Sequence, residues 1–141
     1  MVVRVTETPP VRVLTADDHL EFRLTAHELV DATPGFVPVA EAESGEQAVD
    51  LALDLEPDLV LMDVHMDGIG GIEAARRILV LLPSTVVALV SVYPPAELPD
   101  DAWTCGAHAI LRKDRLRPRV LRFLWDAACE TRPERPLTLA G

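Results

Sequence analysis

Four apolar segments of this chain each end in a side chain that can contact phosphate or a metal ion. The segments and the residues that follow them are 11–16 with Asp17 and Asp18, 59–62 with Asp63, 86–90 with Ser91, and 109–112 with Lys113. Short apolar runs bounded by turn residues are typical of strands buried on both faces, as in a parallel sheet. Ligands of open α/β sheets bind beyond the carboxyl ends of the strands. We therefore expect three carboxylates, a hydroxyl and an ammonium group to meet at one edge of a sheet.

Helical patterns lie between the apolar segments, so strands and helices alternate along the chain. The expected strands cover 11–17, 36–42, 58–62, 85–90 and 108–112. The expected helices cover 19–32, 44–56, 72–81, 100–105 and 117–129. This alternation predicts a doubly wound α/β fold with a five-stranded parallel sheet in the flavodoxin-like order 2-1-3-4-5 and helices on both faces.

Prolines and caps refine three of these elements. Pro38 lacks the N–H group that a central strand needs, so the second strand should lie at an edge of the sheet. Ser44 and Gln47 have the spacing of a capping box at the start of the second helix. The prolines of 94–99 leave room for only a short fourth helix.

The length of 141 residues suits one domain, which we expect over 11–130, between a flexible N-terminal segment (1–10) and a flexible tail or linker start (131–141). Charges or prolines interrupt every apolar stretch before it reaches the length of a membrane span, and the first ten residues do not have the pattern of a secretory signal. Cys105 and Cys129 lack the spacing of a disulfide framework or a metal knuckle. The composition therefore predicts a cytoplasmic protein that does not bind membranes.

The charge is divided unevenly along the chain. The net charge is −10, made up of −14 over residues 1–111 and +4 over 112–141. So acidic a chain is poorly suited to binding nucleic acid, and we expect this domain to bind none. The basic cluster between Arg112 and Arg122 is either a docking face for an acidic partner or a solvated helix surface. Lys113 is the only lysine, and an arginine fork would not replace its compact ammonium group.

The strand-end residues together fit phosphoryl transfer to a carboxylate. Asp17, Asp18 and Asp63 would repel one another unless a cation lay between them, and oxygen ligands suit Mg²⁺. An Asp63 oxygen could then attack phosphorus, since aspartyl-phosphates are an established form of nucleophilic catalysis. Lys113 and Ser91 would supply an ammonium group and a hydroxyl donor to the phosphoryl oxygens. Taken singly, such residues are more often a capping aspartate, a surface lysine or a strand-end serine.

Three segments match the motifs of a known family in order and spacing. They are 13–19 (VLTADDH), 57–66 (PDLVLMDVHM) and 106–114, which runs from Gly106-Ala107 to Lys113-Asp114. Over about residues 11–130, the chain resembles the receiver domain of bacterial two-component response regulators, in particular the kind that precedes a helix-turn-helix effector. The resemblance implies a receiver fold and a signalling switch that is not an enzyme beyond its own phosphorylation and dephosphorylation.

The resemblance also implies a role for each matching acidic residue. Asp63 would be the phosphoacceptor. Asp18 would bind Mg²⁺ directly, Asp17 mainly through a water molecule, and the backbone carbonyl of His65 would be a third protein ligand beside Asp63. The alternative that the His65 side chain binds the metal fits less well, because its neighbours form an oxygen site.

The remaining matches concern the switch. Ser91 corresponds to the hydroxyl that moves toward the phosphoryl group, and Lys113 to the lysine that binds it. Ile110 stands where the family usually has a switch aromatic residue, and isoleucine cannot reproduce the inward swing of a ring. His65 and Tyr93 occupy positions that typically tune the lifetime of the phosphoryl group.

The chain departs from the family pattern at two further positions, because the family usually has proline where Asp67 stands and often aspartate where Gly70 stands. The leading hypothesis is a switch that accepts phosphate from a sensor histidine kinase or a small phosphodonor. It would signal through the face of its fourth helix, fifth strand and fifth helix, to a partner or to a second copy in a homodimer. One alternative is a non-phosphorylated pseudo-receiver that acts as a protein-interaction scaffold. A Mg²⁺-dependent phosphatase is weaker, because such enzymes usually have a second aspartate where His65 stands.

Overall fold

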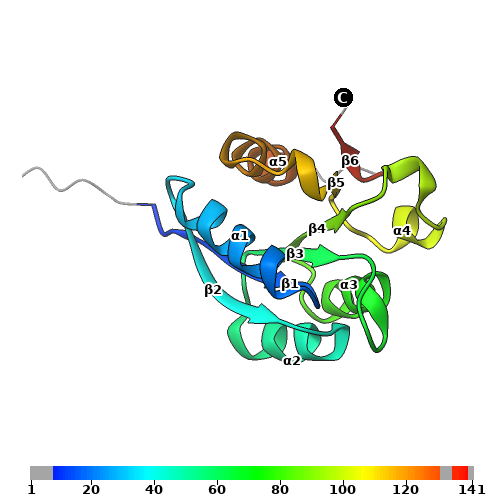
Figure 1. Ribbon diagram of the computed structural model, residues 1–141. Coiled ribbons are helices and arrows are strands. Elements are labelled where there is room, and N and C mark those ends of the chain that lie inside the picture. Colours follow the sequence, from blue (N-terminus) through cyan, green and yellow to red (C-terminus); the bar gives the residue numbers. More distant parts are fainter. Residues whose placement is uncertain (1–7, 131–134, 140–141) are drawn as a thin grey trace, which may run out of the picture.

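The strands form one parallel sheet at the centre of the molecule, with the order β2-β1-β3-β4-β5-β6 (Figure 1). A computed structural model describes residues 8–130 and 135–139. The strands are β1 (Val11–Ala16), β2 (Phe36–Ala42), β3 (Leu59–Asp63), β4 (Val86–Ser91), β5 (Ala109–Arg112) and β6 (Leu137–Thr138). The predicted doubly wound fold and the order of its first five strands are confirmed.

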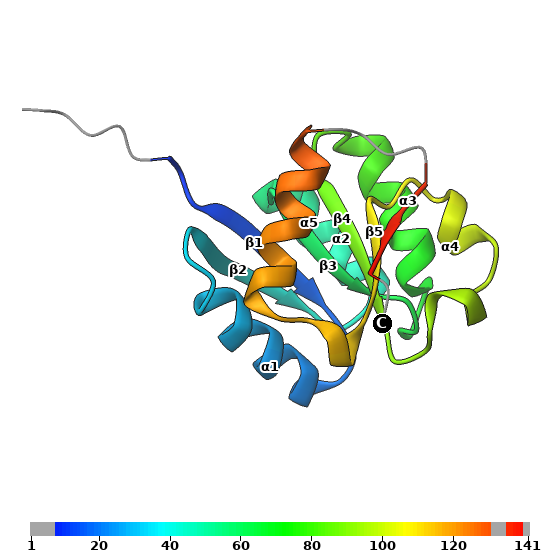
Figure 2. The same ribbon diagram turned by 90° about the horizontal axis from the view of Figure 1, so that it is seen from above.

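Helices cover both faces of the sheet, as Figures 1 and 2 show. The α-helices are α1 (Leu20–Asp31), α2 (Gly45–Leu55), α3 (Gly70–Leu81), α4 (Asp101–Thr104) and α5 (Pro118–Glu130), with two 3₁₀ turns, η1 (Pro95–Glu97) and η2 (Lys113–Arg115). One buried cluster contains side chains of α2, α3 and α4, and the other contains side chains of α1 and α5. No helix among the described residues is both long enough and apolar enough to cross a membrane.

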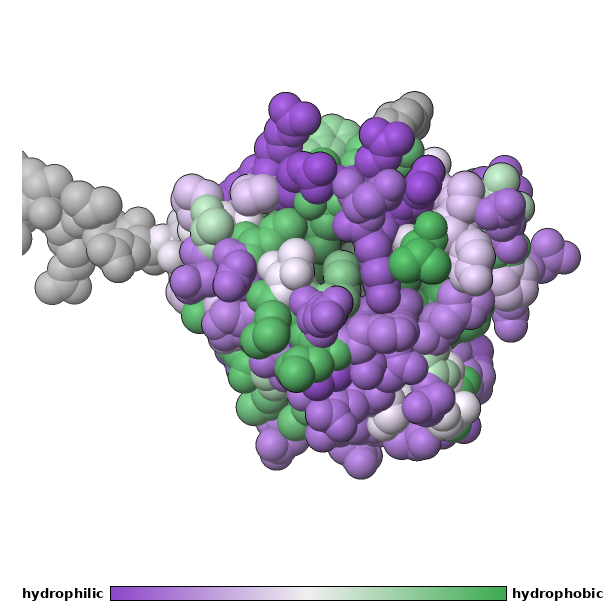
Figure 3. All heavy atoms as spheres, in the orientation of Figure 1, coloured by the Kyte–Doolittle hydropathy of each residue, from purple (hydrophilic) through white to green (hydrophobic). Residues whose placement is uncertain are grey.

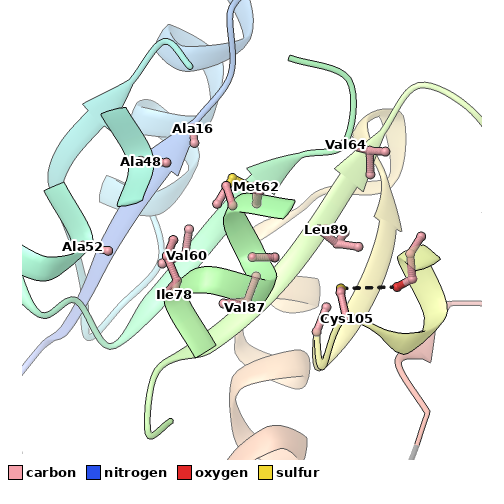
Figure 4. Close-up of a cluster of buried hydrophobic side chains, with 14 of the residues drawn as sticks. Ala16, Ala48, Ala52, Val60, Met62, Val64, Ile78, Val87, Leu89 and Cys105 are labelled. Atoms are coloured by element: carbon pink, nitrogen blue, oxygen red, sulfur yellow. Dashed lines mark hydrogen bonds between the residues drawn. The ribbon is translucent and has the colours of Figure 1, made fainter. Parts of the chain in front are cut away.

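The central strands bury both of their faces, because side chains alternate along a strand. Val60 and Met62 of β3 enter the cluster beneath α2 and α3, whereas Leu59 and Leu61 enter the cluster beneath α5. Figure 4 shows the first cluster, in which Val60 and Met62 meet Ile78 of α3. Burying each such side chain stabilises the fold by about 1.5–3 kcal/mol. The strands are therefore fixed in register, and the positions of their carboxyl ends follow from that register.

The predicted caps and the predicted edge strand are present. Ser44 Oγ accepts a hydrogen bond from the Gln47 N–H (3.1 Å), and Gln47 Oε1 accepts one from the Glu43 N–H (2.7 Å). The side chain of Gln47 thus reaches one residue further back than the cap residue itself. β2 forms an edge of the sheet, and its register with β1 shifts beside Pro38.

The third helix begins at Gly70, two residues earlier than predicted. Gly70 has φ +81°, which glycine adopts at little cost, and the Gly71 N–H donates to the Val64 carbonyl (3.1 Å). A side chain at Gly71 would collide with the backbone carbonyl of Asp63. This close approach places the start of α3 directly beyond the end of β3.

The prediction of five strands was incomplete, because the structure has a sixth. Leu137 and Thr138 pair in parallel with Ala109 and Ile110, and the Leu137 N–H donates to the His108 carbonyl (2.9 Å). An edge strand leaves backbone groups unpaired, and a short extended segment can satisfy them. Two residues beyond a proline carry no periodicity that would have revealed this strand. Of the predicted flexible termini, residues 1–7, 131–134 and 140–141 lie outside the described residues.

Candidate functional site

The carboxyl ends of β1, β3 and β5 bring two aspartates and the lysine together. Asp17 follows β1, Asp63 is the last residue of β3, and Lys113 follows β5. Lys113 Nζ lies 2.5 Å from Asp17 Oδ2 and 3.6 Å from Asp63 Oδ1. The ammonium group therefore contacts Asp17 more closely than Asp63. Both carboxylates are almost completely buried, at 0% and 3% exposure of the residue.

Asp18 and His19 complete an acidic cluster around these residues. Asp17 Oδ1 accepts a hydrogen bond from the His19 N–H (2.8 Å). The His19 Nδ1 atom lies 3.2 Å from Asp17 Oδ1 and 2.8 Å from Asp18 Oδ1. One ligand atom from each of Asp17, Asp18, His19 and Asp63 can be chosen so that all four lie within 4.8 Å of one another. This spacing is small enough for a single ion to touch several of them.

The electrostatics of the cluster disfavour a charged Asp63. The pKa of Asp63 is raised from 3.8 to about 6, first by burial and then by the charge of Asp17. The Lys113 ammonium group and a hydrogen bond with the His65 backbone oppose this rise but do not cancel it. One lysine thus compensates two buried carboxylates, and Asp18 adds a third negative charge nearby. Additional positive charge would stabilise the ionised form of Asp63.

The donor set fits a hard divalent cation. The carboxylates of Asp17, Asp18 and Asp63 offer oxygen ligands of the kind that Mg²⁺ prefers. Asp18 Oδ1 is buried without a hydrogen bond, although His19 Nδ1 is close to it. A buried carboxylate oxygen without a donor is costly, and a cation would satisfy it. The predicted contribution of the His65 carbonyl stays a prediction.

Sequence reasoning missed two side chains that hold the site together. The Phe22 ring lies under the Lys113 ammonium group, with 4.5 Å between Nζ and the ring centroid. Arg23 is buried, and its Nη1 donates to the backbone carbonyl of Asp17 (2.8 Å). Both residues stand in the first turn of α1, which starts at the same edge of the sheet as the acidic cluster. That position was the signal that could have pointed to them.

The two predicted switch residues lie on the neighbouring strands. Ser91 ends β4 and is fully buried, and its Oγ accepts a hydrogen bond from the Tyr93 N–H (3.0 Å). Ile110 is 1% exposed and pairs with Leu89 in the cluster beneath α4, so it belongs to the core and not to the charged cluster. Beyond the ends of β3 and β4, the rings of His65 and Tyr93 pack edge to face, with centroids 5.3 Å apart.

Comparisons with known proteins show what this chain is similar to. The family model described as the response regulator receiver domain matches residues 13–123. Response regulator GacA of Pseudomonas aeruginosa is 37% identical over 103 residues, which are 73% of this chain and 48% of that protein. The nitrate/nitrite response regulator protein NarL of Escherichia coli K12 is 34% identical over 119 residues, which are 84% and 55% of the two chains. This chain thus spans about half the length of these curated relatives.

Solved structures show the same likeness. A two-component response regulator of the LuxR family from Aurantimonas superposes with a TM-score of 0.78 at 28% identity, and the match covers 91% of this chain and 89% of that one. The response regulator domain of Thermotoga maritima CheB gives a TM-score of 0.75 at 27% identity, covering 88% and 99% of the two chains.

Proposed function

This chain belongs to the family of response regulator receiver domains, and we propose that it is a phosphorylation switch in which Asp63 accepts the phosphoryl group. The observation that carries the proposal is the contact of one lysine with two buried aspartates at the carboxyl edge of the sheet. Of these aspartates, Asp63 ends the central strand β3, and Asp17 is held by His19 and Lys113. Asp63 is therefore the carboxylate best placed to react.

The reaction that we propose forms a bond between an Asp63 carboxylate oxygen and phosphorus. The bond between phosphorus and the leaving group of the donor breaks, and the leaving group keeps its electron pair. Mg²⁺, held by Asp17, Asp18 and Asp63 with the His65 carbonyl, would neutralise charge on the phosphoryl oxygens when bound. The Lys113 ammonium group would turn from Asp17 toward a phosphoryl oxygen, a short movement because it already lies between the two carboxylates.

Ser91 would supply the remaining hydrogen bond to the phosphoryl group. Its Oγ already accepts from the Tyr93 backbone, so the hydroxyl proton is available to an oxygen that arrives on Asp63. Ile110 would follow this movement as part of the packed core, without a ring that swings inward. The signal would then travel through the backbone of β4 and β5.

Response regulators of two-component systems receive their phosphoryl group from sensor kinases, and we propose a sensor histidine kinase or a small phosphodonor here. Leu20 and Leu24 of α1 are more than half exposed, and Figure 3 shows hydrophobic side chains gathered over α1. Exposed apolar patches often mark protein contacts, so this surface beside the site suits the kinase. The domain itself would be a regulator and not an enzyme with an external substrate. A cytoplasmic location fits its two free cysteines.

The output face that we propose is formed by α4, β5 and the start of α5, and its occupant is a second copy of this chain. The stretch before β5 exposes Glu97, Asp100 and Asp101, whereas η2 and α5 expose Arg115 and Arg119. These two groups lie on opposite faces of the sheet. If two copies are related by a two-fold axis that points out of the β5 edge, the face with the acids in one copy lies opposite the face with the arginines in the other. The acids of each copy then meet the arginines of its partner. The output that we propose is the regulation of transcription, since the chain is also similar to the transcriptional regulatory protein DegU of Brevibacillus brevis.

Intact-mass spectrometry with acetyl phosphate and Mg²⁺ tests the proposed function. We expect the native chain to gain the mass of one phosphoryl group and Asp63→Asn to gain none. Asp67→Asn, an exposed aspartate four residues further on, is the matched control and should behave like the native chain. No gain in the native chain, or an equal gain in Asp63→Asn, would contradict the proposal. The first of these results would favour the pseudo-receiver scaffold.

A further inference from the structure

The outer edge of β5 is covered by the chain's own C-terminal strand over only half of its length. β6 pairs with Ala109 and Ile110, and Figure 2 shows it in red beside β5. Beyond this pairing the edge continues into a groove of about 280 Å³. The groove is lined by Pro94, Pro95, Ile110, Leu111, Arg112, Arg115 and Leu139. A strand that follows the direction of β6 would therefore run into the groove.

We propose that the β5 edge is a strand-docking surface which Leu137–Leu139 occupies in cis, and that this segment competes with a second copy of the chain for the output face. The competition rests on the homodimer of the proposed function. The two-fold axis of that dimer leaves the molecule through the β5 edge, and β6 lies on this edge. A docked β6 therefore holds the two β5 strands apart.

The contacts of β6 suit a segment that can detach from β5. Its backbone pairing extends over two residues, and the described part of the segment is anchored by the Leu137 N–H, by the partly buried Leu137 side chain against the cluster beneath α5, and by the buried Pro136. Thr138 and Leu139 are exposed. Edge elements with few buried contacts open at low free-energy cost compared with the core. The segment can thus shield the edge at rest and give way to a larger interface.

The groove also contains a buried polar group without a hydrogen-bond partner. The Nε atom of Arg112 is buried without a hydrogen bond, and Arg112 lines the groove. A backbone carbonyl or carboxylate of a longer docked strand would satisfy it. Arg112 pairs with Ser91 across the sheet and directly precedes Lys113.

Sedimentation velocity on Leu137→Pro tests the competition. Proline removes the N–H that donates to the His108 carbonyl, so the variant should release β6. If β6 is docked about nine-tenths of the time in each chain, its release lowers the dissociation constant of the homodimer about a hundredfold, because both copies must expose the β5 edge. Thr138→Ala changes an exposed side chain of the same strand, leaves the backbone pairing intact and is the matched control. Equal association of all three proteins would overturn the proposal.

Hydrogen exchange on the native chain provides a second, independent readout. The Leu137 amide should exchange at least about tenfold more slowly than in an unfolded peptide, and Leu137→Pro should remove protection from the Ile110 amide. Exchange of the Leu137 amide at the unfolded rate would overturn the proposal. Neither experiment needs phosphorylation. Failure of the proposed function would appear separately, as an absent response to beryllofluoride and Mg²⁺ in native and variant chains alike.

Discussion

The acidic cluster and the β4–β5 side of the sheet lie next to each other but are held together by different forces. At the ends of β1 and β3, Asp17 and Asp63 are buried carboxylates, and Lys113 compensates only part of their charge. On β5, Ile110 sits in an apolar cluster between Leu89 and the residues of α4. The first region depends on the chemical identity of its residues, whereas the second depends on shape and packing.

This difference accounts for one departure from the expected family pattern, the one at Ile110. A carboxylate that accepts a phosphoryl group has no substitute of similar shape, because the reaction needs its charge. A packed core position tolerates another apolar side chain of similar volume. The proposed phosphoacceptor and the residues proposed to act with it, Asp17, Asp18, Ser91 and Lys113, are all present, while Ile110 stands where the resemblance predicts an aromatic residue.

The largest expected effect concerns the charged region. Lys113→Ala should slow phosphoryl incorporation from acetyl phosphate about 10²–10³-fold, because the developing charge on the phosphoryl oxygens loses its ammonium partner. Lys113→Arg should restore only part of the rate, since a planar fork does not fit the place of a compact ammonium group. Arg115→Ala, an exposed residue of the same turn, is the control. Unchanged incorporation in Lys113→Ala would mean that the contact with Asp17 is only structural.

The packed region should respond in the opposite way. Ile110→Ala should lower the free energy of unfolding by about 2–5 kcal/mol, and Ile110→Val by about 0.5–1.5 kcal/mol, because each leaves a cavity beneath α4. The rate of phosphoryl incorporation in Ile110→Val should stay within about twofold of the native rate, since the residue does not touch the acidic cluster. Urea unfolding and intact-mass kinetics measure the two quantities. If Ile110→Val slowed phosphoryl incorporation strongly but changed the free energy of unfolding little, the two regions would not differ in the way described.

The pH dependence of stability separates the two regions further. A carboxyl whose pKa rises from 3.8 in the unfolded chain to about 6 in the fold stabilises the protein below pH 3.8 relative to neutral pH, and this stability is lost as the pH rises through 6. At about 1.4 kcal/mol for each pH unit between the two values, the charged Asp63 costs about 2–3 kcal/mol at pH 7.

Without Mg²⁺, Asp63→Asn should therefore raise the free energy of unfolding by about 2–3 kcal/mol at pH 7 and by much less near pH 4. Asp67→Asn, at an exposed position, should change it by less than about 0.5 kcal/mol at either pH. Denaturant titrations at the two pH values provide the measurement. A stabilisation by Asp63→Asn that is the same at both would show that the charge of Asp63 is not its cause.

The smallest expected effect concerns the contact between Phe22 and Lys113. Phe22→Leu removes a cation–π interaction worth about 0.5–1 kcal/mol at an exposed site, which corresponds to about a two- to fivefold slower phosphoryl incorporation. Phe22→Tyr keeps the aromatic face and should retain the native rate. Leu24→Ala, an exposed residue of the same helix, serves as the control. Equal rates of phosphoryl incorporation with Leu and with Phe at position 22 would show that the ring does not contribute to the reaction.

The sequence predicted the meeting of Asp17, Asp63 and Lys113 because parallel strands bring their carboxyl ends to one edge. It did not reveal which carboxylate the lysine contacts more closely, since that depends on side-chain rotamers. Phe22 and Arg23 were not predicted for a similar reason. Helical periodicity indicates which residues are buried, but not which charged group a buried side chain will contact. β6 was not predicted because two residues are too few to show a periodic pattern, and because its pairing depends on the free edge of a strand distant in the sequence.

The identity of the phosphorylated residue tests the central claim most directly. After reaction with acetyl phosphate and Mg²⁺, borohydride reduction converts an aspartyl-phosphate into a stable alcohol, which peptide mass spectrometry can locate. We predict the reduced residue at position 63, and no signal at Asp17, which contacts Lys113, or at Asp18. Reduction at Asp17 or Asp18, or an unmodified Asp63 in a chain that has gained phosphate, would contradict this prediction.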